Sequence, residues 1–199
     1  MIDTKLRGKV QPVFDQAGKG FVYLKIKPNQ ITVAALLFGL FAGGLIAFGH
    51  LIPALLFLWV SGFLDVLDGT VARIMKLSSN LGAFLDLIFD RLVEAGIIIG
   101  FFFLKPEDAF FYLLFFVSVL FNFSTFMVAG ALFQNAGSKS MHYDIGLAER
   151  TETFLCFSAM LIWVNQSAYL LFVFTLLIFL TGIIRFFRII KYHKQQDKS

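Results

Sequence analysis

Hydrophobic residues fall into six long runs along the chain, and short polar segments separate these runs. A helix needs about 20 mostly apolar residues to cross the hydrocarbon core of a bilayer. Helices also satisfy their backbone hydrogen bonds internally, which lipid requires. The pattern therefore predicts an all-α integral membrane protein with six transmembrane helices. The predicted spans are 31–49, 52–74, 81–104, 109–133, 153–165 and 168–190, of which the fifth is the shortest.

The first 30 residues follow a different pattern, because apolar residues recur at helical spacing between basic ones. This spacing is typical of an amphipathic helix on an anionic membrane surface, although a plain juxtamembrane leader explains it equally well. We expect three parts: an amphipathic juxtamembrane segment over 1–30, a six-helix transmembrane domain over 31–190, and a basic tail over 191–199.

Composition narrows the class of protein further. Hydrophobic residues make up 58% of the chain, charged residues 15%, and the mean hydropathy is +0.80. A soluble domain has about a quarter of its residues charged, and a disordered chain has low hydrophobicity, so both classes are excluded. The single cysteine, Cys156, cannot form an intrachain disulfide.

Basic residues lie almost entirely on one predicted side of the membrane. Of the 17 Lys and Arg, all but Arg91 and Lys105 fall in the N-terminal segment, the 73–80 loop, the 134–152 loop or the C-terminal end. Cytoplasmic loops are enriched in Lys and Arg. We therefore expect a multi-pass protein of the cytoplasmic membrane with both termini in the cytoplasm.

Five acidic residues lie inside the second and third predicted spans, where each carboxylate costs about 2.5–3.5 kcal/mol. Two are spaced i, i+3 and three are spaced i, i+4, i+8, so each set shares one helix face. They are Asp65 and Asp68, then Asp86, Asp90 and Glu94. Arg73 and Arg91 could compensate part of this charge, and a divalent metal is the stronger candidate. All-oxygen ligands suit Mg²⁺ or Mn²⁺, whereas three scattered His residues offer no zinc site.

Small residues flank this acidic cluster. Gly69 and Ala72 lie beside Asp68 and Arg73, and Gly82 lies one turn before Asp86. Glycine in a helix interior costs up to about 1 kcal/mol relative to alanine, but it lets a helix or ligand approach closely. These positions leave room for a flat group beside the metal.

The acidic stretch reads Asp65-x-x-Asp68-Gly69-x-x-Ala72-Arg73, eight residues, then Gly82-x-x-x-Asp86-x-x-x-Asp90. It resembles the signature of the CDP-alcohol phosphotransferase family at every fixed position and gap. The resemblance extends to Pro28-Asn29-x-x-Thr32, to Gly146-Leu147-Ala148-Glu149-Arg150 and to Arg185.

Members of that family transfer a phosphatidyl group from a CDP-linked lipid, such as CDP-diacylglycerol, to a small polar alcohol and release CMP. The resemblance implies a homodimer whose 31–190 domain is catalytic, with its site open to the cytoplasm, and no nucleic-acid partner. It implies one or two Mg²⁺ or Mn²⁺ ions, bound by Asp65, Asp68, Asp86 and Asp90, with Asp90 also as the general base. The implied CDP-binding residues are Asp65, Asp68, Gly69, Ala72, Arg73, Gly82 and Thr32. Asn29 and Thr32 could instead form only a helix N-cap and turn.

The acceptor alcohol is less defined. In the branch of the family that uses inositol phosphate, basic residues of the fourth to sixth spans hold the acceptor phosphate, and Arg150 and Arg185 match two of them. The third is missing, because 124–130 contains no Lys or Arg, and Lys139 is a substitute from the loop. The branch resembled most is that of the phosphatidylinositol-phosphate and phosphatidylglycerophosphate synthases. We expect an inositol phosphate or glycerol phosphate acceptor, with serine a weaker candidate.

Simpler interpretations remain open. The acids could be structural ion pairs, Glu94 could pair with Arg91, and Arg150 and Arg185 could be ordinary loop or tail charges. The main alternative function is a cation or proton transporter that uses intramembrane carboxylates. A transporter should have polar groups continuing across the membrane, and the first, fourth and fifth spans offer few. A lipid-binding scaffold is a third class, and it would not require four acids at this spacing.

Overall fold

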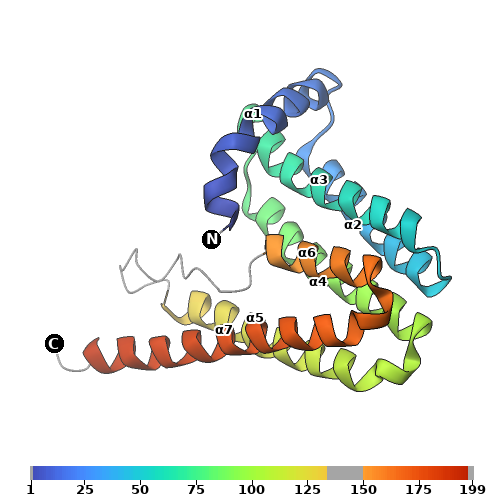
Figure 1. Cartoon of the computed structure of the whole chain (residues 1–199). Coiled ribbons are helices and arrows are strands. Elements are labelled where there is room, and N and C mark those ends of the chain that lie inside the picture. The colour runs from blue at the N-terminus through green and yellow to red at the C-terminus, as the bar shows by residue number, and fades with distance from the viewer. Residues whose placement is uncertain (1, 134–149, 197–199) are drawn as a thin grey trace. The chain divides into compact units, whose positions relative to one another are not determined.

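The computed structural model describes residues 2–133 and 150–196, and all regular structure in these ranges is helical (Figure 1). The long helices are α1 (Ile2–Tyr23), α2 (Pro28–Ala47), α3 (Leu51–Met75), α4 (Asn80–Leu104), α5 (Ala109–Phe133), α6 (Arg150–Ile162) and α7 (Ser167–Gln196). The short 3₁₀ turns η1 (Pro106–Asp108) and η3 (Val164–Gln166) precede α5 and α7. The all-α prediction is confirmed over the described residues.

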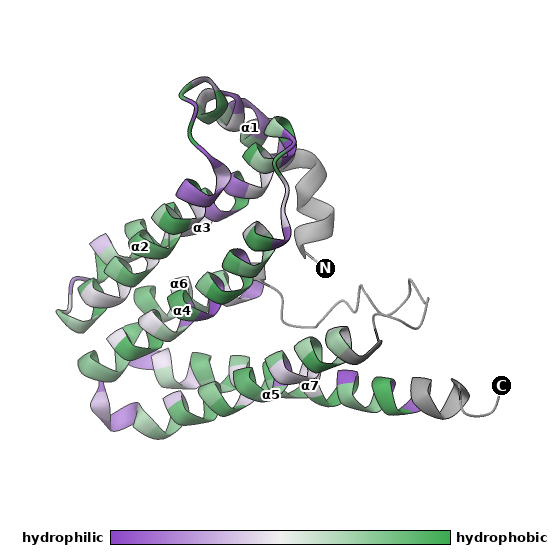
Figure 2. Ribbon diagram, turned by 180° about the vertical axis from the view of Figure 1, so that it is seen from behind, coloured by the Kyte–Doolittle hydropathy of each residue, from purple (hydrophilic) through white to green (hydrophobic). Residues whose placement is uncertain are grey.

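Within the described residues, four segments are long and apolar enough to cross a membrane: Pro28–Ala47, Leu51–Met75, Pro106–Ala131 and Val164–Lys191. Figure 2 shows hydrophobic colouring along most of α2, α5 and α7. The third predicted span, α4, carries four charged residues, and the fifth, α6, has only 13 residues. The apolar helices indicate an integral membrane protein, while the count of six spans stays a prediction.

Local sequence signals explain where the helices near the acidic cluster begin and end. Pro28 is the first residue of α2, a position where its fixed φ suits a helix and its missing N–H is no loss. Lys76 ends α3 in a left-handed conformation with φ of 55°. Ser79 caps α4, because its Oγ accepts a hydrogen bond from the Gly82 N–H at 3.0 Å. The N-cap interpretation of Thr32 is wrong, since its Oγ1 donates to the Pro28 carbonyl from inside the helix, at 3.1 Å.

The chain forms two compact units, Ile2–Asp108 and the part from Ala109 onward. In the first unit, α2 and α3 run antiparallel: the Ser61 Oγ donates to the Ala35 carbonyl at 2.7 Å, and Phe57 stacks on Phe38 further along. The helix pair α2 and α4 runs parallel, because Gly39 faces Val93 and Gly43 faces the Gly96 backbone. Helix α2 therefore packs against both α3 and α4.

Helix α1 packs on α3 in the same unit. The rings of Phe14 and Phe63 lie 5.3 Å apart, and Gly18 faces the side chains of Thr70 and Ile74. This contact anchors α1 to the protein, while its end at Tyr23 is 86% exposed. Its predicted association with the membrane surface stays a prediction.

The second unit is built on α5 and α7, with α6 packed on α7. The helices α5 and α7 run in the same direction, since Phe111 pairs with Phe172 and, further along both helices, Phe121 pairs with Phe179. Phenylalanine rings fill much of this interface, which suits a core between helices that also face lipid.

Candidate active site

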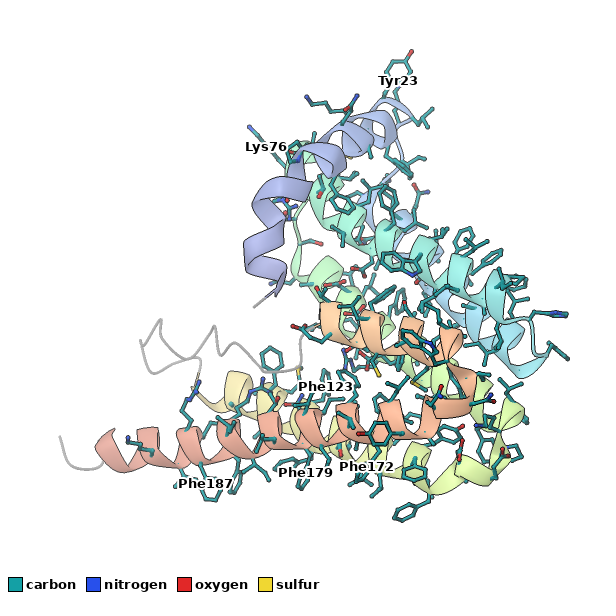
Figure 3. The ribbon with its side chains drawn as sticks, in the orientation of Figure 1. Tyr23, Lys76, Phe123, Phe172, Phe179 and Phe187 are labelled. Atoms are coloured by element: carbon teal, nitrogen blue, oxygen red, sulfur yellow. The ribbon has the colours of Figure 1, made fainter. Side chains whose placement is uncertain are left out.

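Three carboxylates from two helices meet in the first unit. One oxygen from each of Asp65, Asp68 and Asp86 lies within 4.8 Å of the other two. Asp65 and Asp68 on α3 are 9% and 7% exposed, and Asp86 on α4 is partly buried. The turn between Lys76, labelled in Figure 3, and Ser79 connects the two helices and aims the acidic faces at each other. The sequence prediction that these three residues converge is confirmed.

This donor set fits a hard divalent cation. Buried carboxylates this close repel one another, and a cation between them removes that repulsion. Three oxygen donors within 4.8 Å are compatible with one ion that also keeps water or substrate ligands. Asp90, one turn after Asp86, is not a member of the three-carboxylate set. Its predicted roles as metal ligand and base therefore stay predictions.

The small residues predicted beside the cluster leave space there. A β-carbon built at Gly69 would meet only Arg73 Nη1, at 3.6 Å. One built at Gly82 would meet Ser79 Oγ at 3.3 Å and Asn29 Oδ1 at 3.5 Å. Neither position is filled by a neighbouring backbone, so a flat ligand can approach α3 and α4 at this point.

Arg73 is held at the end of α3. Its Nη2 donates to the Thr70 Oγ1 at 3.0 Å, and that hydroxyl in turn donates to the Val66 carbonyl at 3.1 Å. Thr70 is 1% exposed while Arg73 is exposed, so a buried hydroxyl orients an accessible guanidinium. The sequence indicated Arg73 through the motif, but it did not indicate Thr70, which occupies a variable position within it.

Helix α2 contributes its N-terminal turn to the same level of the unit. Ser61 bonds Ala35, and Gly39 faces Val93, so the helix register brings Thr32 level with Asp65 and Asp86. Thr32 is 4% exposed, and its hydroxyl is hydrogen-bonded within α2. This position is compatible with the predicted place of Thr32 beside the acidic cluster.

Further along α4, Arg91 and Glu94 form an ion pair, in which Arg91 Nη1 lies 2.7 Å from Glu94 Oε2. Glu94 is 8% exposed, so a buried acid is compensated by a base one turn before it. The prediction that Arg91 pairs with a neighbouring carboxylate is confirmed.

Comparison with known proteins decides the family. The sequence profile of the CDP-alcohol phosphatidyltransferases matches residues 25–187. The chain belongs to this family. The inner membrane protein YnjF of Escherichia coli is 33% identical over 165 residues, which cover 79% of this chain and 80% of YnjF.

Two further relatives carry names for inositol phosphate chemistry. An archaetidylinositol phosphate synthase of Pyrococcus horikoshii is 39% identical over 97 residues, which span 49% of this chain and about half of that protein (52%). The crystal structure of Mycobacterium tuberculosis phosphatidylinositol phosphate synthase with CDP-DAG bound matches with a TM-score of 0.76 at 17% identity. That match covers 89% of this chain and 94% of the other, and shows the shared fold. The same protein has a structure in complex with manganese and citrate.

The family's predicted acceptor residues lie in the second unit or outside the described ranges. Lys139 falls in 134–149, which the structure does not describe, and Arg150 is the first residue of α6, with no side chain described. Arg185 of α7 donates from Nη1 to both the carbonyl and the Oδ1 of Asn122, at 3.1 and 2.9 Å. Sequence reasoning did not indicate Asn122. The one sequence signal for such a residue is Arg185 itself. An arginine in an apolar span needs a polar partner, and a neighbouring helix can supply it.

Proposed function

We propose that this protein transfers a phosphatidyl group from CDP-diacylglycerol, or a related CDP-linked lipid, to the hydroxyl of a small phosphorylated alcohol and releases CMP. The observation that carries the proposal is the convergence of Asp65, Asp68 and Asp86 within 4.8 Å, in a chain whose residues 25–187 match the family. The same match favours phosphatidyl transfer over cation or proton transport.

The carboxylates of Asp65, Asp68 and Asp86 would hold one or two Mg²⁺ or Mn²⁺ ions, with Asp90 as a further ligand. When bound, such an ion neutralises pyrophosphate charge and stabilises the departing CMP. Arg73, oriented by Thr70, would add charge-assisted hydrogen bonds to a phosphate oxygen. The CDP group would lie against Gly69, Ala72, Gly82 and Thr32, with Asp65 and Asp68 at its edge. The absence of neighbouring backbone within 4 Å of a β-carbon built at Gly69 or Gly82 supports this assignment.

The chemical step requires a base, because an alcohol is only weakly nucleophilic at neutral pH. We assign this role to Asp90, which would accept the hydroxyl proton as the alcohol oxygen forms its bond to the lipid phosphorus. The phosphorus–oxygen bond to CMP breaks in the same in-line displacement. Glu94, one turn after Asp90, is a like charge that would favour the basicity of Asp90. The ion pair between Glu94 and Arg91 weakens this influence. Burial and the like charge of Asp86 are then the factors that would keep Asp90 basic.

The acceptor would be an anionic alcohol, inositol phosphate or glycerol phosphate, held by Arg150, Arg185 and Lys139. Two of the relatives are named archaetidylinositol phosphate synthase and phosphatidylinositol phosphate synthase, and these names support the inositol phosphate choice. Two arginines suit a phosphate group better than an uncharged alcohol.

At the level of the whole protein, we propose six spans, a homodimer in the cytoplasmic membrane, and both termini and the site on the cytoplasmic side. The α4 and α6 helices would be the third and fifth spans, with 31–190 as the catalytic domain. The segment 1–30 would lie on the membrane surface, and 191–199 would form a basic cytoplasmic tail.

An acceptor screen tests the function. The purified full-length protein, CDP-diacylglycerol and Mn²⁺ or Mg²⁺ are combined with inositol phosphate, glycerol phosphate, serine or inositol. We expect CMP release that requires both the metal and one of the phosphorylated alcohols. A transporter or a scaffold would release no CMP under any of these conditions.

Binding of the metal has its own readout. A ligand at 100 times its Kd stabilises the folded state by about 2.7 kcal/mol. Mn²⁺ should therefore raise the thermal midpoint of the wild-type protein, and it should not do so after Asp65→Asn. An equal shift in both proteins would contradict the assignment of the ion to these carboxylates.

A further inference from the structure

Asn122 of the neighbouring helix α5 binds Arg185 through two of its oxygens. The Nη1 of Arg185 donates to the backbone carbonyl of Asn122 at 3.1 Å and to the side-chain Oδ1 of the same residue at 2.9 Å. The ring of Phe126, one turn further along α5, lies with its centroid 5.4 Å from the guanidinium carbon. Two acceptors and one aromatic face therefore restrict the position and the plane of the guanidinium.

A close approach of the two helices makes this grip possible. Gly182 lies one turn before Arg185, and a β-carbon there would come within 2.7 Å of the Phe121 ring and 3.3 Å of the Asn122 Cα. Only glycine lets α5 come this near at this level. Phe123 and Phe179, labelled in Figure 3, belong to the stretches of α5 and α7 that flank the contact.

The Asn122 carbonyl carries an additional bond. The Thr125 hydroxyl donates to it at 2.7 Å, so this oxygen accepts from Thr125 and from Arg185. A carbonyl that accepts from groups outside the backbone ladder is locally exposed at the helix surface. Asn122 thus presents two oxygens to Arg185, and one of them, the backbone carbonyl, also binds the Thr125 hydroxyl.

We propose that Asn122 is a positioning residue for Arg185, which it holds ready for the phosphate or other oxyanion of the acceptor alcohol. The inference rests on the proposed function, in which Arg185 belongs to the acceptor site. A long arginine side chain loses rotamer freedom when it binds an anion, and a guanidinium already fixed by Asn122 has lost that freedom in advance. Asn122 therefore raises the affinity for the acceptor without contacting it.

A double-mutant cycle tests the inference. Asn122→Ala, Arg185→Ala and the double variant are assayed for CMP release with glycerol 3-phosphate and inositol 1-phosphate as acceptor probes. We expect Arg185→Ala to raise the acceptor KM by about 30-fold or more, in the range for a lost bond to a charged group. Asn122→Ala should raise it about fivefold, because the backbone carbonyl remains. The double variant should match Arg185→Ala, since Asn122 acts through Arg185.

Two controls separate positioning from folding. Ser118→Ala removes a buried hydroxyl one turn before Asn122 on α5 and should leave both KM values unchanged. Asn122→Asp keeps an oxygen acceptor in place and should preserve the thermal midpoint, yet its charge neutralises Arg185 and should raise the acceptor KM. The KM for CDP-diacylglycerol should stay within about twofold in all Asn122 variants. If Asn122 only held α5 and α7 together, Asn122→Asp would show wild-type kinetics.

The possible failures are distinguishable. If the effects of Asn122→Ala and Arg185→Ala add in the double variant, or if Asn122→Asp behaves as wild type, the positioning role is refuted while the proposed function stands. If Arg185→Ala leaves the acceptor KM unchanged, Arg185 is not an acceptor residue and the inference fails with that assignment. If the wild-type protein releases no CMP with any alcohol, the proposed function fails and the inference fails with it.

Discussion

Two regions of the α2–α3–α4 unit use small residues for opposite purposes. Near the C-terminal ends of α2 and α4, Gly43 and Gly100 bring the backbones of the two helices into contact, so that a β-carbon on either would collide with a main-chain carbonyl. At the acidic end, β-carbons on Gly69 and Gly82 would meet only side-chain atoms, at 3.6 Å for Gly69 and at 3.3 and 3.5 Å for Gly82. The same residue type therefore closes one interface and leaves room at the other.

The comparison shows that the role of a glycine in a membrane helix depends on what lies opposite it. Close packing of backbones substitutes for a hydrophobic driving force that lipid does not supply between helices. Space beside buried carboxylates serves a ligand instead. We expect changes at the contact formed by Gly43 and Gly100 to affect folding, and changes at the acidic end to affect chemistry while leaving folding nearly intact.

The largest effect is expected from Asp68→Asn. Losing one ligand of the three-carboxylate set should lower CMP release about 1,000-fold, equivalent to about 4 kcal/mol in the barrier. Without metal, the variant should be no less stable than wild type, because repulsion within the cluster falls. Asp108→Asn, which removes a carboxylate paired with Lys105 at the other end of α4, is the matched control and should retain activity. Loss of folded protein with Asp68→Asn would contradict the division between the two regions.

Gly43→Ala should have the next largest effect, and on stability. Its methyl group would meet the Gly96 backbone, and overpacking of this kind costs about 3 kcal/mol. Denaturant unfolding in detergent measures the loss. The adjacent Gly44 has nothing within 4 Å, so Gly44→Ala should stabilise the protein by up to about 1 kcal/mol. Equal stabilities for the two variants would show that the helices do not approach closely.

Gly69→Ala tests the open space at the acidic end. The methyl group has room in the protein alone, so the free energy of unfolding should not fall. The KM for CDP-diacylglycerol should rise about tenfold, or about 1.4 kcal/mol, because the methyl group occupies ligand space. Steady-state kinetics at saturating acceptor measures it, with Gly44→Ala as the control for a methyl group added elsewhere. An unchanged KM for CDP-diacylglycerol would show that Gly69 does not contact the CDP group.

The smallest effect is expected from Ser79→Ala. The Ser79 hydroxyl caps α4 through the Gly82 N–H, and losing such a cap costs about 1 kcal/mol. The thermal midpoint should fall by a few degrees, while Ser78→Ala, next to it and exposed, should leave it unchanged. A matching loss in both variants would indicate that the turn as a whole, and not the cap, supports α4.

The sequence by itself determined the class of protein and the core of the site. Hydropathy predicted the spans to within a few residues of α2, α3, α4 and α5, because lipid imposes length and apolarity on any helix that crosses it. The spacing of Asp65, Asp68 and Asp86 predicted their convergence, since residues three or four apart share a helix face and a short connection lets the acidic faces of two antiparallel helices point at each other.

Only the tertiary structure decided which groups meet across helices. The contacts of Gly43 with Gly96 and of Arg185 with Asn122 join residues more than 50 positions apart, at a register that depends on how two apolar surfaces interlock. Apolar faces are chemically similar at every register, so hydropathy does not distinguish one pairing from the next. Packing of specific side-chain shapes makes that choice, and it also assigns Thr32 to the interior of α2, where the sequence allowed an N-cap.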